Sequence, residues 1–121
     1  MIDIEKLKVV GYFSLSISVL LTNNLSKNQI KKIDGISKNK NCLYFYLIGQ
    51  LGVSDFYIDM KVGSLLLSYA INEIKKAQKV VGGRYILIDA INHLKVINFY
   101  QNNGFKILFE DRETIKMVYK L

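Results

Sequence analysis

The feature that most constrains the fold is a change of hydrophobic period midway along the chain. The segment Leu43–Leu51 is continuously apolar and aromatic, as is typical of a central strand buried on both faces. From Lys61 the apolar residues recur at the spacing of a helix instead. The stripe expected to face the core consists of Val62, Leu65, Leu66, Tyr69, Ile74, Ala77 and Val81. The pair Gly82–Gly83 ends this helix, and a strand over Arg84–Ala90 follows. These elements predict a helix packed on a sheet.

The N-terminal part of the chain adds a second strand and a short helix. Apolar residues and serines alternate over Lys8–Leu20, which predicts a long half-buried strand. Ser26 is followed three residues later by Gln29, and this capping-box pattern opens a short helix that reaches Ile33. This half of the chain therefore reads as strand, short helix and strand.

The C-terminal part contains one more helix and two short strands. Asn92 can cap a helix that ends near Asn102, with a glycine just past its end. The segments Lys106–Phe109 and Thr114–Tyr119 alternate as a closing hairpin. The resulting order of strands and helices predicts one mixed α/β domain over residues 1–121.

Composition excludes several classes of protein. No apolar run reaches the length of about 18 residues that a membrane span needs, and the first residues do not form a signal peptide. The single cysteine, Cys42, excludes an internal disulfide and suits a cytoplasmic protein. We expect no metal site. The net charge of +7 fits a nucleic acid or a polyanionic ligand as partner, or merely a lysine-rich composition spread over the whole chain.

One group of residues that could carry chemistry lies at the start of the long helix. A helix N-terminus offers unpaired backbone N–H groups and the positive end of the helix dipole, so it attracts phosphate. Gly63 and Ser64 are small and lie in the first turn, and Lys61 adds a positive charge beside them. By itself this motif is weak, because a single glycine in a first turn is usually structural.

A second group is formed by Asn98-Phe99-Tyr100 and Asn103-Gly104-Phe105. Together with the strand, loop and helix before them, these segments resemble the cofactor-binding half of the GNAT superfamily of N-acetyltransferases. Residues 10–14 also look like a strand of that family, so the resemblance extends from about Lys8 to Leu121. It implies a mixed, mostly antiparallel sheet flanked by helices. By comparison with that fold, the first strand and the two helices after it are missing.

The resemblance implies acetyl-CoA as co-substrate and places its pantetheine arm along a splayed strand. In the family this strand separates from its neighbour, and the arm pairs with the freed backbone. The matching positions are Leu51, Gly52 and Val53. Gly49 and Gly52 fit a distorted strand, while an ordinary strand with two glycines near its end is the open alternative.

The resemblance also places the cofactor's pyrophosphate on the first turn of the long helix. The residues concerned are Lys61, Val62, Gly63 and Ser64. The family motif runs from Gln or Arg through two residues to Gly, one residue, and Gly or Ala. Here only Gly63 survives, since Ile58 and Lys61 stand at the other two positions. Asp59 is a further departure, because a carboxylate beside a diphosphate is unfavourable.

Tyr100 matches the family's general acid, which protonates the thiolate leaving group. The alternative is a half-buried tyrosine that anchors its helix to the sheet. Asn92 matches an asparagine that contacts the pantetheine, or it is simply the helix cap, and His93 reads as an exposed residue of the first turn. No general base is evident, because the splayed strand carries Gln50 and only the loop after it carries acids, Asp55 and Asp59.

The function implied is transfer of an acetyl group from acetyl-CoA to a primary amine. Within the GNAT superfamily, the chain looks most like a bacterial branch that includes the toxins of toxin–antitoxin pairs, on the evidence of segments Tyr46–Leu51 and Val81–Arg84. Members of that branch acetylate the amino group of aminoacyl-tRNA. That branch implies tRNA and an antitoxin protein as partners. The alternative is a catalytically impaired module that binds CoA, RNA or a protein partner. The exposed edge of the Lys8–Leu20 strand also predicts a homodimer.

Overall fold

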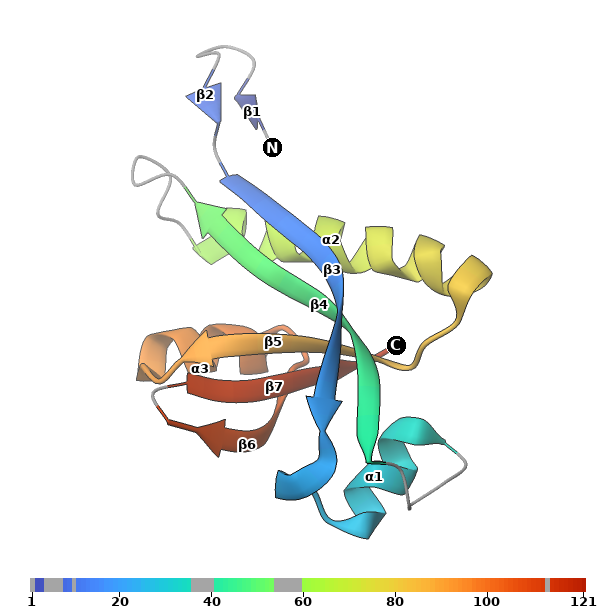
Figure 1. The fold of residues 1–121 in the computed structure, drawn as a ribbon. Helices are drawn as coiled ribbons and strands as arrows, with labels where there is room; N and C mark the ends of the chain where they lie inside the picture. Colours follow the sequence, from blue (N-terminus) through green and yellow to red (C-terminus); the bar gives the residue numbers. More distant parts are fainter. Residues whose placement is uncertain (1, 4–7, 10, 36–40, 54–59, 113) are drawn as a thin grey trace.

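The computed structural model describes residues 2–3, 8–9, 11–35, 41–53, 60–112 and 114–121 (Figure 1). Within these ranges a sheet has the strand order β3-β4-β5-β7-β6. The strands are β3 (Gly11–Leu21), β4 (Cys42–Val53), β5 (Tyr85–Ile91), β6 (Lys106–Asp111) and β7 (Thr114–Lys120). Only β4 and β5 pair in parallel, and the other neighbours pair antiparallel. The predicted mixed, mostly antiparallel sheet is therefore confirmed.

The helices and two minor elements complete this part of the chain. The helices are α1 (Lys27–Asp34), α2 (Met60–Val81) and α3 (Leu94–Asn102). A single 3-10 turn, η1 (Thr22–Asn24), precedes α1, and β1 (Ile2–Asp3) pairs with β2 (Lys8–Val9) as a separate two-stranded unit. Figure 1 shows β3 and β4 as a long twisted pair, with α1 at the end where β4 begins.

Local sequence signals explain where the helices begin and end. At α1 the Ser26 hydroxyl accepts a hydrogen bond from the Gln29 backbone N–H at 3.1 Å, and the Ser26 N–H donates to the Gln29 side chain at 2.9 Å. This is the predicted capping box. Helix α2 ends at two glycines with positive φ angles, 83° at Gly82 and 107° at Gly83. The Tyr46 hydroxyl of β4 donates to the Gly82 carbonyl, which joins the end of α2 to the sheet.

The face of α2 that packs on the sheet differs from the predicted stripe. Leu66 and Ile74 are buried as predicted, but Leu65, Tyr69 and Val81 are exposed. Among the described side chains of this helix, the other buried positions are Gly63, Leu67, Ala70 and Ile71. Both sets repeat at helical spacing, because apolar residues cover a wide arc of this helix. The sequence pattern identified the helix correctly but did not choose between the two overlapping stripes.

Two apolar clusters cover the two faces of the sheet. The larger cluster joins α2 and, through partly buried residues, α3 to one face, where Ile86, Ile88 and Met117 are almost fully buried. The smaller cluster joins Ile30 and Ile33 of α1 to the opposite face. Helices α2 and α3 therefore share one side of the sheet, and α1 lies on the other.

The predicted strand at the start of the chain forms, but its apolar face is not half-buried. Strand β3 is an edge strand that pairs only with β4. Phe13 packs against the larger cluster, whereas Leu15, Ile17, Val19 and Leu21 are exposed in the described structure. We call these four residues and the exposed Tyr44 of β4 the uncovered face.

Candidate functional site

Strands β4 and β5 separate along their length. They pair only at Tyr46 with Ile86 and at Leu47 with Leu87, although β4 continues to Val53 and β5 to Ile91. Figure 1 shows the two strands diverging beyond this point. The second half of β4 thus has backbone groups that do not pair with β5, as the splayed-strand interpretation predicts.

Gly49 marks a local distortion of β4 just before the predicted pantetheine positions. Ser14 of β3 pairs with Gln50 and Leu15 pairs with Ile48, so Gly49 is the extra residue of a bulge. After the bulge, the backbone of Leu51, Gly52 and Val53 pairs with Phe13, Tyr12 and Gly11 on the β3 side. Their edge toward β5 is the free one. The role of these three residues in holding a cofactor stays a prediction.

The two groups of residues singled out from the sequence meet in space. Gly63 and Ser64 lie in the first turns of α2, and Phe99 and Asn103 lie at the end of α3. The Asn103 side-chain amide donates to the Ser64 hydroxyl at 3.3 Å and to the Phe99 carbonyl at 2.8 Å. The start of α2 and the end of α3 therefore form one structural unit beside the splayed strands. Asn103 was not predicted to make this contact, since its partner lies 39 residues away in the sequence.

Gly63 has a packing role that is visible in the structure. A Cβ atom at this position would lie 3.1 Å from the ring of Phe99, which is closer than side chains normally pack. The structural interpretation of this glycine is thereby supported, while its predicted phosphate contact remains to be tested. The backbone of Lys61 and Val62 lies in the same turn of α2. Of the loop before it, Ile58, Asp55 and Asp59 lie outside the described residues.

Tyr100 is held among aromatic rings. It packs edge-on against Phe99, with ring centroids 5.2 Å apart, and against Phe105 at 5.5 Å. Burial raises the pKa of the Tyr100 phenol above its ordinary value, so the hydroxyl keeps its proton at neutral pH. Within the described residues this hydroxyl forms no hydrogen bond. The side chain is thus a protonated donor, and it is also an anchor of α3 on the core.

The cap of α3 is one residue later than predicted. His93 is the N-cap, and its Nδ1 atom accepts a hydrogen bond from the Lys95 backbone N–H at 3.2 Å. Asn92 instead donates from its side-chain amide to a carboxylate oxygen of Glu110 at 3.2 Å. The interpretation of Asn92 as a simple cap is therefore wrong, because the imidazole of the following residue takes that place. A contact of Asn92 with a pantetheine arm stays a prediction.

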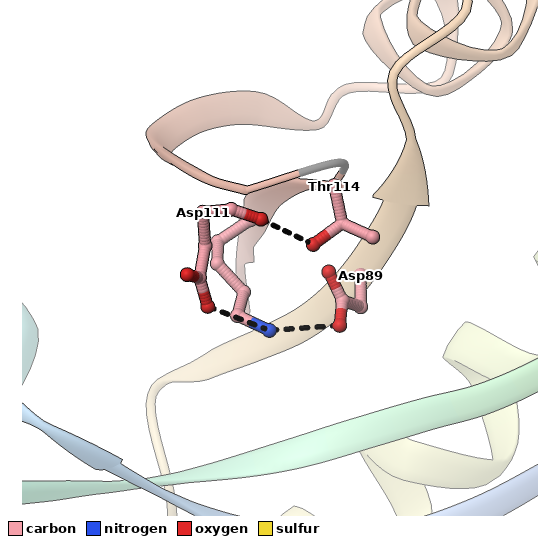
Figure 2. A network of polar contacts seen from close by, with 4 residues as sticks. Asp89, Asp111 and Thr114 are labelled. Atoms are coloured by element: carbon pink, nitrogen blue, oxygen red, sulfur yellow. Dashed lines mark hydrogen bonds and ion pairs between the residues drawn. The ribbon is translucent and has the colours of Figure 1, made fainter.

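The structure contains an ion-pair network on β5, β6 and β7 that was not predicted from the sequence (Figure 2). The Lys116 ammonium lies 2.8 Å from the Asp89 carboxylate and 3.9 Å from that of Asp111. Burial opposes ionisation of Asp89, but the hydrogen bond from Lys116, the nearby Thr114 hydroxyl and the charge of Lys116 outweigh it and lower the pKa. Because Asp89 and Lys116 are register partners, opposite charges on paired strands were the available signal. Asp89 is engaged by this lysine and is a poor candidate for a general base.

Two further observations bear on the class of protein. No helix among the described residues is long and apolar enough to cross a membrane. The described side chains of β4 include no carboxylate, so a general base is not found on the described part of the splayed strand.

Comparison with solved structures identifies the fold. The crystal structure of a bacterial toxin matches 98% of this chain with a TM-score of 0.79 and 19% identity, and 64% of that toxin is covered. A tyrosine-to-phenylalanine mutant of the toxin KacT matches 92% of this chain with a TM-score of 0.71 and 24% identity, over 62% of its own length. The toxin AtaT in complex with acetyl-methionyl-tRNAfMet matches 92% with a TM-score of 0.70 and 23% identity, over 63% of its length.

The chain thus spans less than two thirds of the length of these structures. Neither a protein-family model nor a curated protein sequence matches it at a significant level. At these identities the likeness is one of fold. The mixed five-stranded sheet and the splayed β4 and β5 fit this likeness, and the chain has a GNAT-like α/β fold over the part that it spans.

Proposed function

We propose that the chain takes part in acetyl transfer from acetyl-CoA to a primary amine. The observation that carries this proposal is the separation of β4 from β5 beside the joined ends of α2 and α3. Free backbone groups at Leu51, Gly52 and Val53 suit an extended pantetheine arm, which would pair with them as an added strand does. Free backbone N–H groups at the start of α2, at Lys61 and Val62, suit a diphosphate, and the small residues Gly63 and Ser64 in the following positions leave room for it.

Tyr100 would supply the proton that the reaction needs at sulfur. The amine nitrogen attacks the thioester carbonyl, the C–N bond forms, the C–S bond breaks, and the sulfur leaves as a thiolate. A phenol that burial keeps protonated can give its proton to that thiolate, while the amine loses its own proton to solvent or to a base. The raised pKa ensures that the donor form is populated at neutral pH.

An aminoacyl-tRNA is the acceptor that we favour. AtaT has been solved with acetyl-methionyl-tRNAfMet, and an AtaT mutant has been solved with acetyl-CoA and the C-terminus of the antitoxin AtaR. The net charge of +7 suits a polyanionic substrate such as tRNA. By the same analogy we propose an antitoxin-like protein as partner.

Substitution of Tyr100 by Phe tests the proposal. Calorimetric titration with acetyl-CoA and with desulfo-CoA measures cofactor affinity, and thiol release with bulk aminoacylated tRNA measures turnover. We expect Tyr100→Phe to lower turnover by about 10²-fold or more, with cofactor affinity within about twofold of wild type. Tyr69→Phe, at an exposed tyrosine of α2, is the matched control and should change neither quantity. Equal losses of turnover and affinity at Tyr100 would mean that its role is structural.

The titrations also separate the proposal from its alternative, a binding module without turnover. Binding of both ligands without thiol release would favour a catalytically impaired CoA-binding module. If neither ligand gives heat or thermal stabilisation at millimolar concentration, the cofactor site is not functional in this chain. RNA binding that weakens steeply with salt would then favour the RNA-binding version of the module.

A further inference from the structure

A recess of about 340 Å³ lies on the α1 side of the sheet, away from the splayed strands. Its walls come from α1, from the beginning of β5 and β6, and from the end of β7. The splay opens toward the other end of β5, and α2 and α3 lie on the other face. The recess therefore lies away from the free edge of β4, although Gly104, which follows α3, is one of its lining residues. Its volume falls at the lower end of the range for small-molecule sites, which is about 300–1,000 Å³.

Tyr85 in the wall of this recess carries an unsatisfied polar group. The residue is only 5% exposed, and its hydroxyl is buried without a hydrogen-bond partner among the described residues. Such a hydroxyl costs about 1–3 kcal/mol relative to one that is hydrogen-bonded. Buried polar atoms without partners are rare in folded proteins, and each calls for an explanation. A ligand that accepts a hydrogen bond inside the recess would provide one.

The charges around the recess are all positive. Lys32 of α1, Lys106 of β6 and Lys120 of β7 line it, and no carboxylate does among the described residues. None of these lysines forms a salt bridge within the described structure, in contrast to Lys76 and Lys116. The recess therefore presents uncompensated positive charge.

Apolar side chains complete the lining. Ile33 is buried, and Leu108 and Val118 are partly buried members of the same cluster as Tyr85. A ligand in the recess would thus meet apolar surface from α1, β6 and β7 together with ammonium groups. An inorganic ion alone would leave that apolar surface without a partner.

We propose that this recess binds a small organic anion, with a carboxylate or phosphate group on an aromatic or aliphatic body. The anionic group lies among Lys32, Lys106 and Lys120 and accepts a hydrogen bond from the Tyr85 hydroxyl. The body of the ligand packs on the apolar lining. This proposal does not depend on acetyl transfer, since none of Tyr85, Lys32, Lys106 and Lys120 belongs to the proposed cofactor-binding or catalytic residues.

Titration of the full chain, followed by amide NMR, tests the proposal with four probes. Phenyl phosphate and phenylacetate each carry an anion on an aromatic body, benzyl alcohol lacks the charge, and inorganic phosphate lacks the body. We expect saturable shifts of amides at Lys106, Leu108 and Val118 with one or both aromatic anions. Binding of benzyl alcohol and of inorganic phosphate should be at least about tenfold weaker. The stronger of the two aromatic anions identifies the preferred anionic group.

Two variants test the residues. Lys106→Gln should weaken binding of the preferred probe by about tenfold, whereas Lys79→Gln, at an exposed lysine of α2, should leave it unchanged. Tyr85→Phe should weaken binding several-fold and leave the melting temperature of the free protein equal or higher, because it removes an unsatisfied group. The proposal fails if no probe shifts these amides saturably up to about 20 mM, or if the shifts instead cluster at Ser64 and Phe99. It also fails if Tyr85→Phe lowers the melting temperature and leaves binding intact.

Discussion

Two strands of the same sheet differ in how far their apolar faces are covered. Ile86, the second residue of β5, is fully buried, with 0% of its surface exposed, whereas Ile17 in β3 is 62% exposed. Both lie in strands that the sequence pattern identifies. The difference arises because α2 and α3 pack over the face of β5 that carries Ile86, whereas the face of β3 that carries Ile17 is left exposed in the described structure. Alternation of apolar and polar residues thus predicts a strand and its apolar face. Whether that face is buried depends on which other elements pack against it.

The same substitution at these two isoleucines should have very different effects. We expect Ile86→Ala to lower the free energy of unfolding by about 2–5 kcal/mol, since it leaves a cavity in a packed cluster. On the monomeric chain, Ile17→Ala should cost less than about 1 kcal/mol. Urea unfolding followed by circular dichroism measures both values. Similar losses at the two positions would show that β3 is covered in solution and would remove the contrast.

Self-association offers a second test of the uncovered face. An unpaired edge strand with an exposed apolar side favours pairing with another chain, and we expect a second copy to cover Ile17 and Val19. Ile17→Lys should raise the dimer dissociation constant at least about tenfold, because pairing would bury an ammonium group. Ser16→Lys, at an exposed residue on the other face of the same strand, is the control. Light scattering measures the mass, and a wild-type monomer at tens of micromolar would exclude this dimer.

A smaller effect is expected at α1, which provides the cover on the opposite face of the sheet. Ser26→Ala removes the side-chain half of the capping box and should lower the free energy of unfolding by about 1 kcal/mol. Ser68→Ala, at an exposed position inside α2, should be neutral or slightly stabilising. Urea unfolding of the two variants gives the difference. No loss at Ser26 would mean that α1 packs on the smaller cluster independently of its cap.

Short-range patterns predicted most of the fold, and contacts distant in sequence account for what they missed. The capping box at Ser26 and the end of α2 depend on neighbouring residues, so they were visible in the sequence. The bond from Asn103 to Ser64 and the unsatisfied hydroxyl of Tyr85 depend on how separate elements pack. The local spacing of apolar and polar residues cannot predict contacts of this kind.

The candidate site shows the same limit. The resemblance to a fold family identified Gly63, Ser64 and Tyr100 as candidate site residues. In the structure Gly63 and Ser64 lie beside the end of α3. His93 caps α3, whereas Asn92 donates a hydrogen bond to Glu110 of β6, 18 residues away in the sequence. The sequence therefore located the region, while individual partners required three-dimensional packing.

The smallest expected effect concerns the ion pair between Asp89 of β5 and Lys116 of β7. These two strands belong to the well-packed part of the sheet, but the Asp89 side chain itself is exposed. The pKa of Asp89 is lower in the folded state than its ordinary value of 3.8, so the fold favours the carboxylate. The stabilisation is therefore present above that ordinary value and is lost as pH falls through the lowered pKa. Because Asp89 is 44% exposed, solvent screening limits the effect to at most about 0.5 kcal/mol. The melting temperature of Asp89→Asn should lie slightly below that of wild type at pH 7, and the difference should shrink toward pH 3 and in 1 M salt. A difference that grows toward pH 3 would mean that Asp89 stabilises the fold as a neutral acid, and the sheet surface would then depend on hydrogen bonding rather than on charge.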